Sequence, residues 1–121
     1  MIEQIERPTI LHVCGQTSHI IETMCGTGAQ GISVDLVDLS SIVSRVPSEV
    51  VIVGNLSPVG TLLNGTAEEV RKETRDMLDK MREVPNYILA TGCEIPLETP
   101  YENILAMVET VKNYGNSWQS S

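Results

Sequence analysis

Thr9-Ile10-Leu11-His12-Val13-Cys14-Gly15 contains the first apolar run of the sequence, and a segment of helical period follows it. His12 and Cys14 are two residues apart, so on an extended strand both side chains point to the same face. Imidazole nitrogen and thiolate sulfur are preferred ligands of zinc. The pair can supply two corners of a tetrahedral metal site, with Cys93, just after another apolar run, as the candidate third ligand. The alternative is a hydrogen-bonded His12 at a strand end, with Cys14 and Cys93 as small buried residues.

The same pattern, an apolar run followed by a helical segment, occurs four times. The runs are nearly continuously apolar and contain β-branched residues, as expected for parallel strands covered on both faces. They span residues 9–14, 32–36, 50–53 and 87–90, and the helical segments span residues 18–25, 39–45, 67–83 and 100–114. This alternation predicts an α/β fold of four consecutive β/α units with a parallel sheet and right-handed crossovers.

The last two helical segments carry the clearest boundary signals. Thr66 and Thr99 each precede a Glu at the spacing of a capping box, and Pro100 suits a first helical position. Gly115 is the expected stop of the final helix. The apolar stripes expected to face the core are Val70, Thr74, Met77, Leu78 and Met81 on one helix, and Ile104, Leu105, Val108 and Val111 on the other.

Polar residues gather where the predicted strands end, which is the functional edge of (β/α) folds. Asp35 is a candidate partner that orients the His12 imidazole, or else a helix cap or a solvated loop residue. Asn55 is a candidate for substrate binding, or it holds its own turn. Glu94 is a candidate substrate-binding residue or fourth metal ligand. Gly54 is expected in a tight turn.

The composition limits the classes of partner. The chain has 121 residues and a net charge of −8, so it offers no basic patch for nucleic acid or an anionic membrane. No apolar run approaches the roughly 20 residues of a membrane span. Three cysteines are an odd number without the spacing of a disulfide framework, which favours a reducing cytoplasm. Cys25 lies within a helical segment and is expected to be buried rather than to bind metal.

Four β/α units are half of an eight-unit TIM-type barrel, (β/α)8. Such a piece leaves two sheet edges and an inner face uncovered, which invites association. In a closed eight-stranded barrel, strands three apart are separated by roughly 12 Å, a span that the side chains of His12, Cys14 and Cys93 can bridge. A flat sheet would hold them too far apart. The metal site therefore requires a curved sheet.

Several motifs resemble the C-terminal half of the uroporphyrinogen decarboxylase superfamily. Within that superfamily, the His-x-Cys pair with a distant Gly-Cys resembles the zinc-dependent branch, the methylcobamide:coenzyme M methyltransferases of methanogenic archaea. The motifs are His12-Val13-Cys14-Gly15, Gly54-Asn55-Leu56-Ser57-Pro58, Gly92-Cys93-Glu94-Ile95-Pro96 and Thr99-Pro100-Tyr101-Glu102-Asn103-Ile104.

The resemblance implies zinc held by His12, Cys14 and Cys93, with the fourth position left for the thiol of coenzyme M. The implied reaction transfers a methyl group from a methylated corrinoid protein, which supplies the methylcobamide, to that thiol. Residues 1–114 would be the C-terminal half-barrel and residues 115–121 a flexible tail. Full activity would need the missing N-terminal half.

Two alternatives to this enzyme fragment stay open at this point. One is a non-catalytic half-barrel that associates with a second copy, as a homodimer, or with a partner chain. The other is a metal-free fragment of the uroporphyrinogen decarboxylase type.

Overall fold

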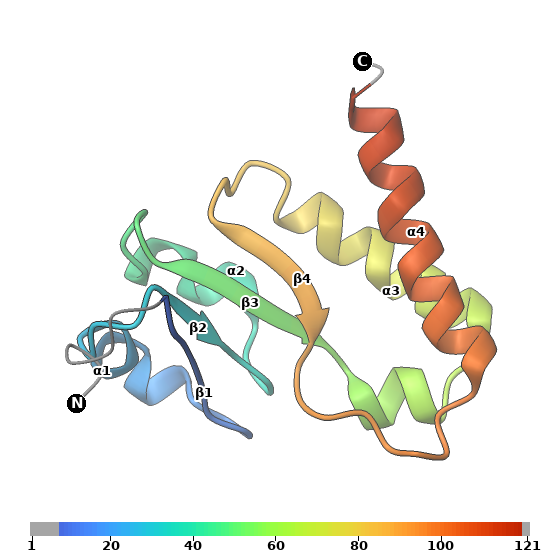
Figure 1. Ribbon diagram of the computed structural model, residues 1–121, viewed down its shortest axis with the longest axis horizontal. Helices are drawn as coiled ribbons and strands as arrows, with labels where there is room; N and C mark the ends of the chain where they lie inside the picture. The colour runs from blue at the N-terminus through green and yellow to red at the C-terminus, as the bar shows by residue number, and fades with distance from the viewer. Residues whose placement is uncertain (1–7, 120–121) are drawn as a thin grey trace.

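The computed structural model describes residues 8–114 in full and the backbone of residues 115–119. Four parallel strands form one sheet in sequence order (Figure 1). The strands are β1 (Ile10–His12), β2 (Gly31–Ser33), β3 (Val51–Leu56) and β4 (Tyr87–Thr91). A helical segment follows each strand, so the predicted α/β fold of four β/α units is confirmed.

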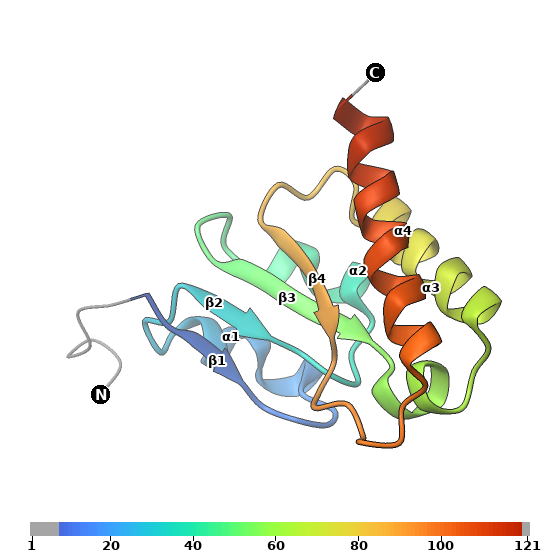
Figure 2. The same cartoon turned by 45° about the vertical axis from the view of Figure 1, so that its right-hand side comes forward.

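The four main helices lie on the outside of the sheet. They are α1 (Ile21–Cys25), α2 (Leu39–Ile42), α3 (Ala67–Lys80) and α4 (Tyr101–Gln119), with short helical turns η2 (Ser18–Ile20), η3 (Val43–Arg45) and η4 (Pro58–Leu63). Figure 2 shows α1 and α2 behind the sheet and α3 beside α4, the pair of helices in most extensive contact. The curvature leaves the opposite face of the sheet open.

The strand register separates a core face from an open face. Leu11, Ile32 and Ile52 pair across β1, β2 and β3, and this row packs with the helices in the larger core cluster. The next row contains His12, Ser33, Val53 and Ile88. Ile88 in that row is 53% exposed. The uncovered inner face expected for four β/α units is therefore present, and it overrides the expectation, drawn from the apolar runs, of strands covered on both faces.

Several predicted boundaries need correction. The third helix ends at Lys80, before Glu83, and α4 continues past Gly115 to Gln119. The six-residue π-helical segment η4 was not predicted. The capping box at Thr66 is confirmed. The one at Thr99 is wrong, since among the described residues its buried hydroxyl has no hydrogen-bond partner. The domain boundary after residue 114 stays a prediction.

The sequence pattern predicted much of the buried face of α3 correctly but not that of α4. On α3, Val70 and Thr74 are fully buried and Met81, just after the helix, is nearly so. On α4 the predicted stripe is wrong, because Leu105 and Val108 are each 39% exposed. The helix instead buries a face of smaller or polar side chains, Asn103, Ala106 and Thr110.

Gly54 lies inside β3 rather than in the predicted turn. Its φ is +151°, a conformation that L side chains rarely adopt. A Cβ at this position would lie 2.8 Å from the carbonyl oxygen of Val34. A glycine within a strand commonly marks such a close approach of two backbone segments. Gly54 therefore lets the segment after β2 lie against β3.

Replacing Gly54 with alanine should lower the free energy of unfolding by about 1–3 kcal/mol, because the new methyl group meets a backbone oxygen and strains φ. The measurement is urea denaturation followed by circular dichroism. Gly26→Ala is the matched control, since Gly26 has a φ of −76° and its added Cβ would meet only ordinary contacts of 3.5 Å or more. Equal midpoints for the two variants would contradict this account.

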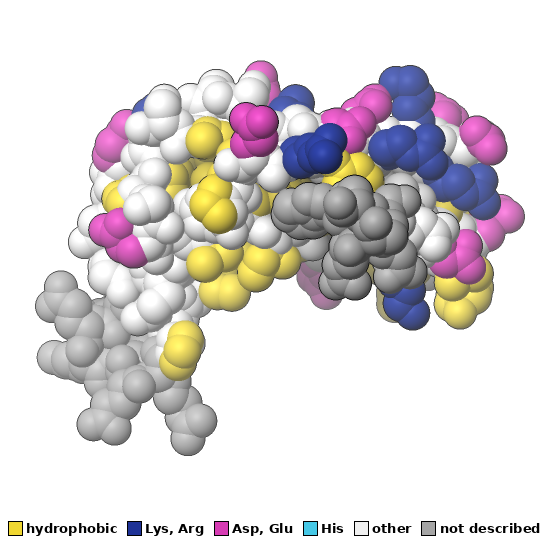
Figure 3. All heavy atoms as spheres, turned by 90° about the horizontal axis from the view of Figure 1, so that it is seen from above, with side chains coloured by type: hydrophobic (Ala, Val, Ile, Leu, Met, Phe, Trp, Pro, Cys, Tyr) yellow, Lys and Arg dark blue, Asp and Glu magenta, His cyan; other side chains and the backbone are white. Residues whose placement is uncertain are grey.

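Charged side chains concentrate over the outer helices. Figure 3 shows Lys, Arg, Asp and Glu gathered on the right of the view, over α3 and α4, while hydrophobic side chains appear nearer the sheet. The exposed residues of α3 include Glu68, Lys72 and Asp76, with an ion pair of 2.8 Å between the last two. This side of α3 is therefore a solvated helix face. Among the described helices, none combines the length and apolarity needed to cross a membrane.

Candidate metal centre

The three predicted ligands lie at the C-terminal ends of β1 and β4. His12 is the last residue of β1, and Cys14 follows it by two positions. Cys93 follows the end of β4, where the backbone N–H of Gly92 donates to Leu56 at 2.9 Å and the Thr91 hydroxyl donates to the Cys93 carbonyl at 2.9 Å. Both sulfur atoms are therefore carried by short segments anchored to the sheet.

The side chains of these residues converge, although β1 and β4 are opposite edges of the sheet. His12 Nε2 lies 3.1 Å from Cys14 Sγ, and Cys14 Sγ lies 2.8 Å from Cys93 Sγ. One ligand atom from each residue lies within 4.8 Å of the other two. The curvature that the sequence analysis required is therefore present.

The donor atoms suit a zinc ion. Tetrahedral zinc with Zn–S near ~2.3 Å and Zn–N near ~2.0 Å separates neighbouring ligand atoms by about 3.3–3.8 Å. The His12 Nε2 to Cys14 Sγ distance of 3.1 Å and the Cys14 Sγ to Cys93 Sγ distance of 2.8 Å are shorter than that range, so an ion would require the two sulfur atoms to move apart by about 1 Å. One imidazole nitrogen and two sulfurs are also the ligand types of many zinc sites that keep an open position. His12, Cys14 and Cys93 thus fit zinc by the chemistry of their donor atoms and by their convergence within 4.8 Å of one another.

A hydrogen bond and nearby negative charges raise the pKa of the Cys14 thiol. Its hydrogen bond with Cys93 raises the pKa of Cys14 above the ordinary value for a thiol. Partial desolvation and the negative charges of Cys93, Asp35 and Glu94 raise this pKa further. An uncharged Cys14 is therefore favoured in the metal-free chain, and metal binding must displace its proton.

The imidazole of His12 is oriented by Ser33 rather than by Asp35. His12 Nδ1 lies 2.9 Å from the hydroxyl of Ser33, its register partner in β2. This contact leaves Nε2 directed at Cys14. The predicted role of Asp35 as the partner of His12 is wrong, because Ser33 occupies that position. Ser33 carries no signal in the sequence alone, and only the strand register indicates its contact with His12.

Asp35 instead lies between the two segments that carry the cysteines. Its Oδ2 accepts a hydrogen bond from the backbone N–H of Gly15 at 2.9 Å. A Cβ on Gly92 would lie 2.6 Å from Oδ1 of the same carboxylate. Asp35 therefore contacts the residue after Cys14 and packs against the residue before Cys93, and Gly92 provides the space.

Asn55 and Glu94 do not join the cluster of ligand atoms. Asn55 Nδ2 donates to the carbonyl oxygens of Asp35 at 2.7 Å and Val37 at 2.5 Å, so its amide holds the segment after β2. The prediction that Asn55 holds a local turn is wrong, because the segment it holds belongs to the neighbouring strand. Glu94 is exposed, and its only described effect is on the pKa of Cys14.

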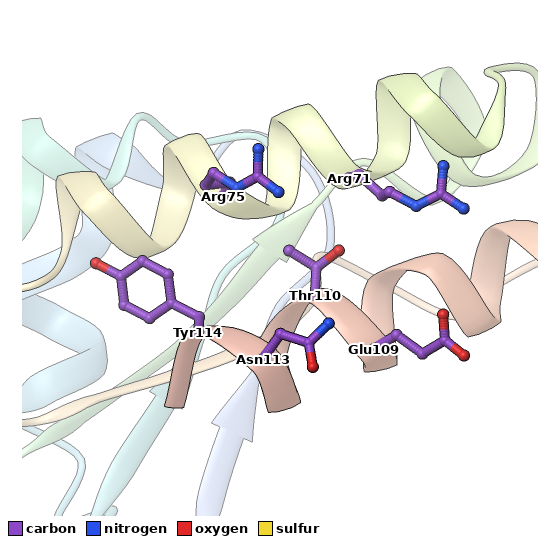
Figure 4. Close-up of a pocket in the computed structure, with 6 residues that line it drawn as sticks. All are labelled: Arg71, Arg75, Glu109, Thr110, Asn113 and Tyr114. Atoms are coloured by element: carbon purple, nitrogen blue, oxygen red, sulfur yellow. The ribbon is translucent and has the colours of Figure 1, made fainter. Parts of the chain in front are cut away.

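A separate hollow of ≈ 380 Å³ lies between α3 and α4. Figure 4 shows Arg71 and Arg75 on α3 facing Glu109 and Asn113 on α4. Two of its polar groups are already used: the Tyr114 hydroxyl donates to Asp79, and the Thr110 hydroxyl donates to Ala106 within α4. None of the predicted ligands lines this hollow, so it is a groove of helix packing apart from the metal cluster.

Comparison with known proteins identifies the family of the chain. The family model described as "Uroporphyrinogen decarboxylase (URO-D)" matches residues 1–114. The chain belongs to the URO-D family. Methylcobamide:CoM methyltransferase MtbA of Methanosarcina acetivorans is 40% identical over 93% of this chain and 32% of the relative. A uroporphyrinogen decarboxylase of Prochlorococcus marinus is 34% identical over 88% of this chain and 30% of that protein.

A solved structure of a methyltransferase from Methanosarcina mazei resembles the chain with a TM-score of 0.81 and 29% sequence identity. The match covers 93% of this chain and 33% of the solved one. The chain therefore spans about a third of the length of these URO-D family relatives, less than the half expected from the count of β/α units. Its position at their C-terminal end stays a prediction.

The motifs that suggested this family have structural roles in the chain. Gly54 and Asn55 join β3 to the segment after β2, as described above. Asn103, in the first turn of α4, donates through Nδ2 to the carbonyl oxygens of Leu62 and Gly65, both at 2.9 Å. Gly54, Asn55 and Asn103 thus hold segments that follow β2 and β3, and none of the three belongs to the ligand cluster.

Proposed function

We propose that this chain supplies the zinc-binding, thiol-activating part of a methyl transfer from a methylated corrinoid protein to coenzyme M. The observation that carries the proposal is the convergence of His12 Nε2, Cys14 Sγ and Cys93 Sγ at the C-terminal edge of the sheet. The identity to MtbA, a methylcobamide:CoM methyltransferase, supports the same reaction class. The relatives are about three times as long, so the rest of the barrel would come from another segment or chain.

The three ligands leave one tetrahedral position for a substrate thiol. Zinc, when bound, lowers the pKa of a coordinated thiol so that the reactive thiolate prevails at neutral pH. His12 contributes a neutral donor and the two cysteines contribute anionic donors. Ser33 holds the imidazole in the orientation that presents Nε2, and Asp35 positions the segment after Cys14.

Zinc uptake and proton release test this function directly. The reduced chain should take up one equivalent of zinc in competition with a chromogenic chelator. Coenzyme M added to the zinc-loaded chain in weak buffer near pH 7 should release about one proton per chain, because a thiol that binds zinc is deprotonated. An analogue of coenzyme M without the thiol should release none. No zinc uptake, or equal proton release with both compounds, would overturn the proposal.

Ser33→Ala should weaken zinc binding by about 10- to 100-fold, because the imidazole loses the hydrogen bond that orients it. The same chelator competition measures the affinity. Ser44→Ala is the control, since Ser44 is an exposed residue in η3 and has no part in the ligand cluster. Unchanged affinity in Ser33→Ala would show that the contact does not support the site.

A further inference from the structure

We propose that Cys14 and Cys93 form a redox-active thiol pair, which low-molecular-weight disulfides convert to an intramolecular disulfide in the metal-free chain. The proposal rests first on the sulfur geometry, which is independent of the function proposed above. Its second part, that zinc and the disulfide exclude each other, rests on the proposed function, because both states use the same sulfur atoms.

The two sulfur atoms already lie close to bonding distance. Their separation is 2.8 Å, and a disulfide bond of ~2.04 Å requires a further approach of about 0.8 Å. Both residues lie in segments that follow strands rather than within the ladder, so small side-chain rotations can close the gap. Among the described cysteines, Cys25 is the third, and it packs against the core from α1.

The pair is also accessible to a reagent. Cys14 is exposed and Cys93 is half-buried, so a small disulfide can reach the first sulfur from solvent. The sulfur of Cys93 then lies next to the mixed disulfide on Cys14 and can attack it without a large conformational change. Proximity of this kind favours the second step over release of the reagent.

The disulfide forms by two successive thiol–disulfide exchange steps. The thiolate of one cysteine attacks a sulfur of the small disulfide, which forms a mixed disulfide and releases one small thiolate. The other cysteine, after losing its proton, attacks the protein sulfur of that bond and releases the second small thiolate. Two protein thiols are thereby oxidised to one disulfide, and the small disulfide is reduced to two thiols.

Bound zinc should block this chemistry. Cys14 and Cys93 would then be engaged with the metal and separated by the coordination geometry, so neither sulfur would be free to attack. Conversely, the disulfide removes two of the three protein ligands. Loss of the metal would therefore allow Cys14 and Cys93 to form the disulfide.

The test uses the full chain, reduced and stripped of metal, and treated with oxidised glutathione. Intact mass should fall by two hydrogen atoms, and non-reducing peptide mapping should join the peptides that contain Cys14 and Cys93. One equivalent of zinc added beforehand should slow the reaction by at least about 10-fold. Cys25→Ser should still form the bond, whereas Cys93→Ser should stop at a glutathione adduct.

The outcomes separate this inference from the proposed function. A chain that binds zinc but, when stripped, retains three free thiols or only glutathione adducts would overturn the inference alone. A disulfide that joins Cys25 to either residue would also overturn it. A chain that forms the Cys14–Cys93 bond yet takes up no zinc would overturn the proposed function and the protection by metal, while the thiol pair would stand.

Discussion

Cys93→Ala should lower the affinity of the chain for zinc by more than about 100-fold, which exceeds the loss expected for a residue that only orients a ligand. Of the three proposed ligands, Cys93 alone follows β4, and the other two lie at the end of β1. Its removal leaves His12 and Cys14, two donors from one segment, which cannot complete a three-ligand site. Zinc content after dialysis and competition with a chelator both measure the effect.

Cys25→Ala is the matched control for this experiment. Cys25 is also a thiol, but it lies at the end of α1 against the core, and the cluster of ligand atoms does not include it. Its replacement should leave zinc affinity unchanged while it costs some packing energy. If the two variants hold zinc equally well, Cys93 is not a ligand and the proposed centre is wrong.

Asn103→Ala should lower the free energy of unfolding by about 2–4 kcal/mol, the largest loss of stability expected here for a single polar residue. Asn103 is 1% exposed, and its amide group satisfies the carbonyl oxygens of Leu62 and Gly65. A buried acceptor left without a donor costs about 1–3 kcal/mol, and the truncated side chain also leaves a cavity. Urea denaturation of the chain measures the loss.

Asn113→Ala is the control for Asn103, because it is the same substitution on the same helix at an exposed position. Its effect should stay within about 0.5 kcal/mol. Asn103→Asp should be at least as damaging as alanine, since a carboxylate offers no N–H to the two carbonyl oxygens. A stable Asn103→Asp variant would mean that these hydrogen bonds do not hold η4 against α4.

The convergence of His12, Cys14 and Cys93 was predictable from strand geometry together with the order of the parallel strands. Alternation along a strand puts His12 and Cys14 on one face, and the shared C-terminal edge of parallel strands brings Cys93 near them. The identity of the imidazole partner was not predictable in this way. Ser33 rather than Asp35 contacts His12 because the strands pair in a register that places Ser33 opposite His12, and that register depends on the whole sheet.

The remaining errors arise where packing overrides local pattern. Glycine is a common turn residue, yet Gly54 lies within β3, where it leaves room for the carbonyl oxygen of Val34. The apolar residues of α4 suggested a buried stripe, but the helix buries Ala106 in a cluster with Val70 of α3 and leaves Leu105 exposed. Neither result follows from a window of neighbouring residues, because both depend on segments that are distant in sequence.

The origin of the ligands at opposite edges of the sheet also has a consequence for biosynthesis. Cys14 and Cys93 are 79 residues apart, so a nascent chain holds only two of the three ligands until its fourth strand leaves the ribosome. At about 5–20 residues per second, this interval lasts roughly 4–16 s. If these residues bind zinc, the three-ligand site would therefore be complete only after residue 93 has emerged, and until then the chain would carry the His-x-Cys pair without its third ligand.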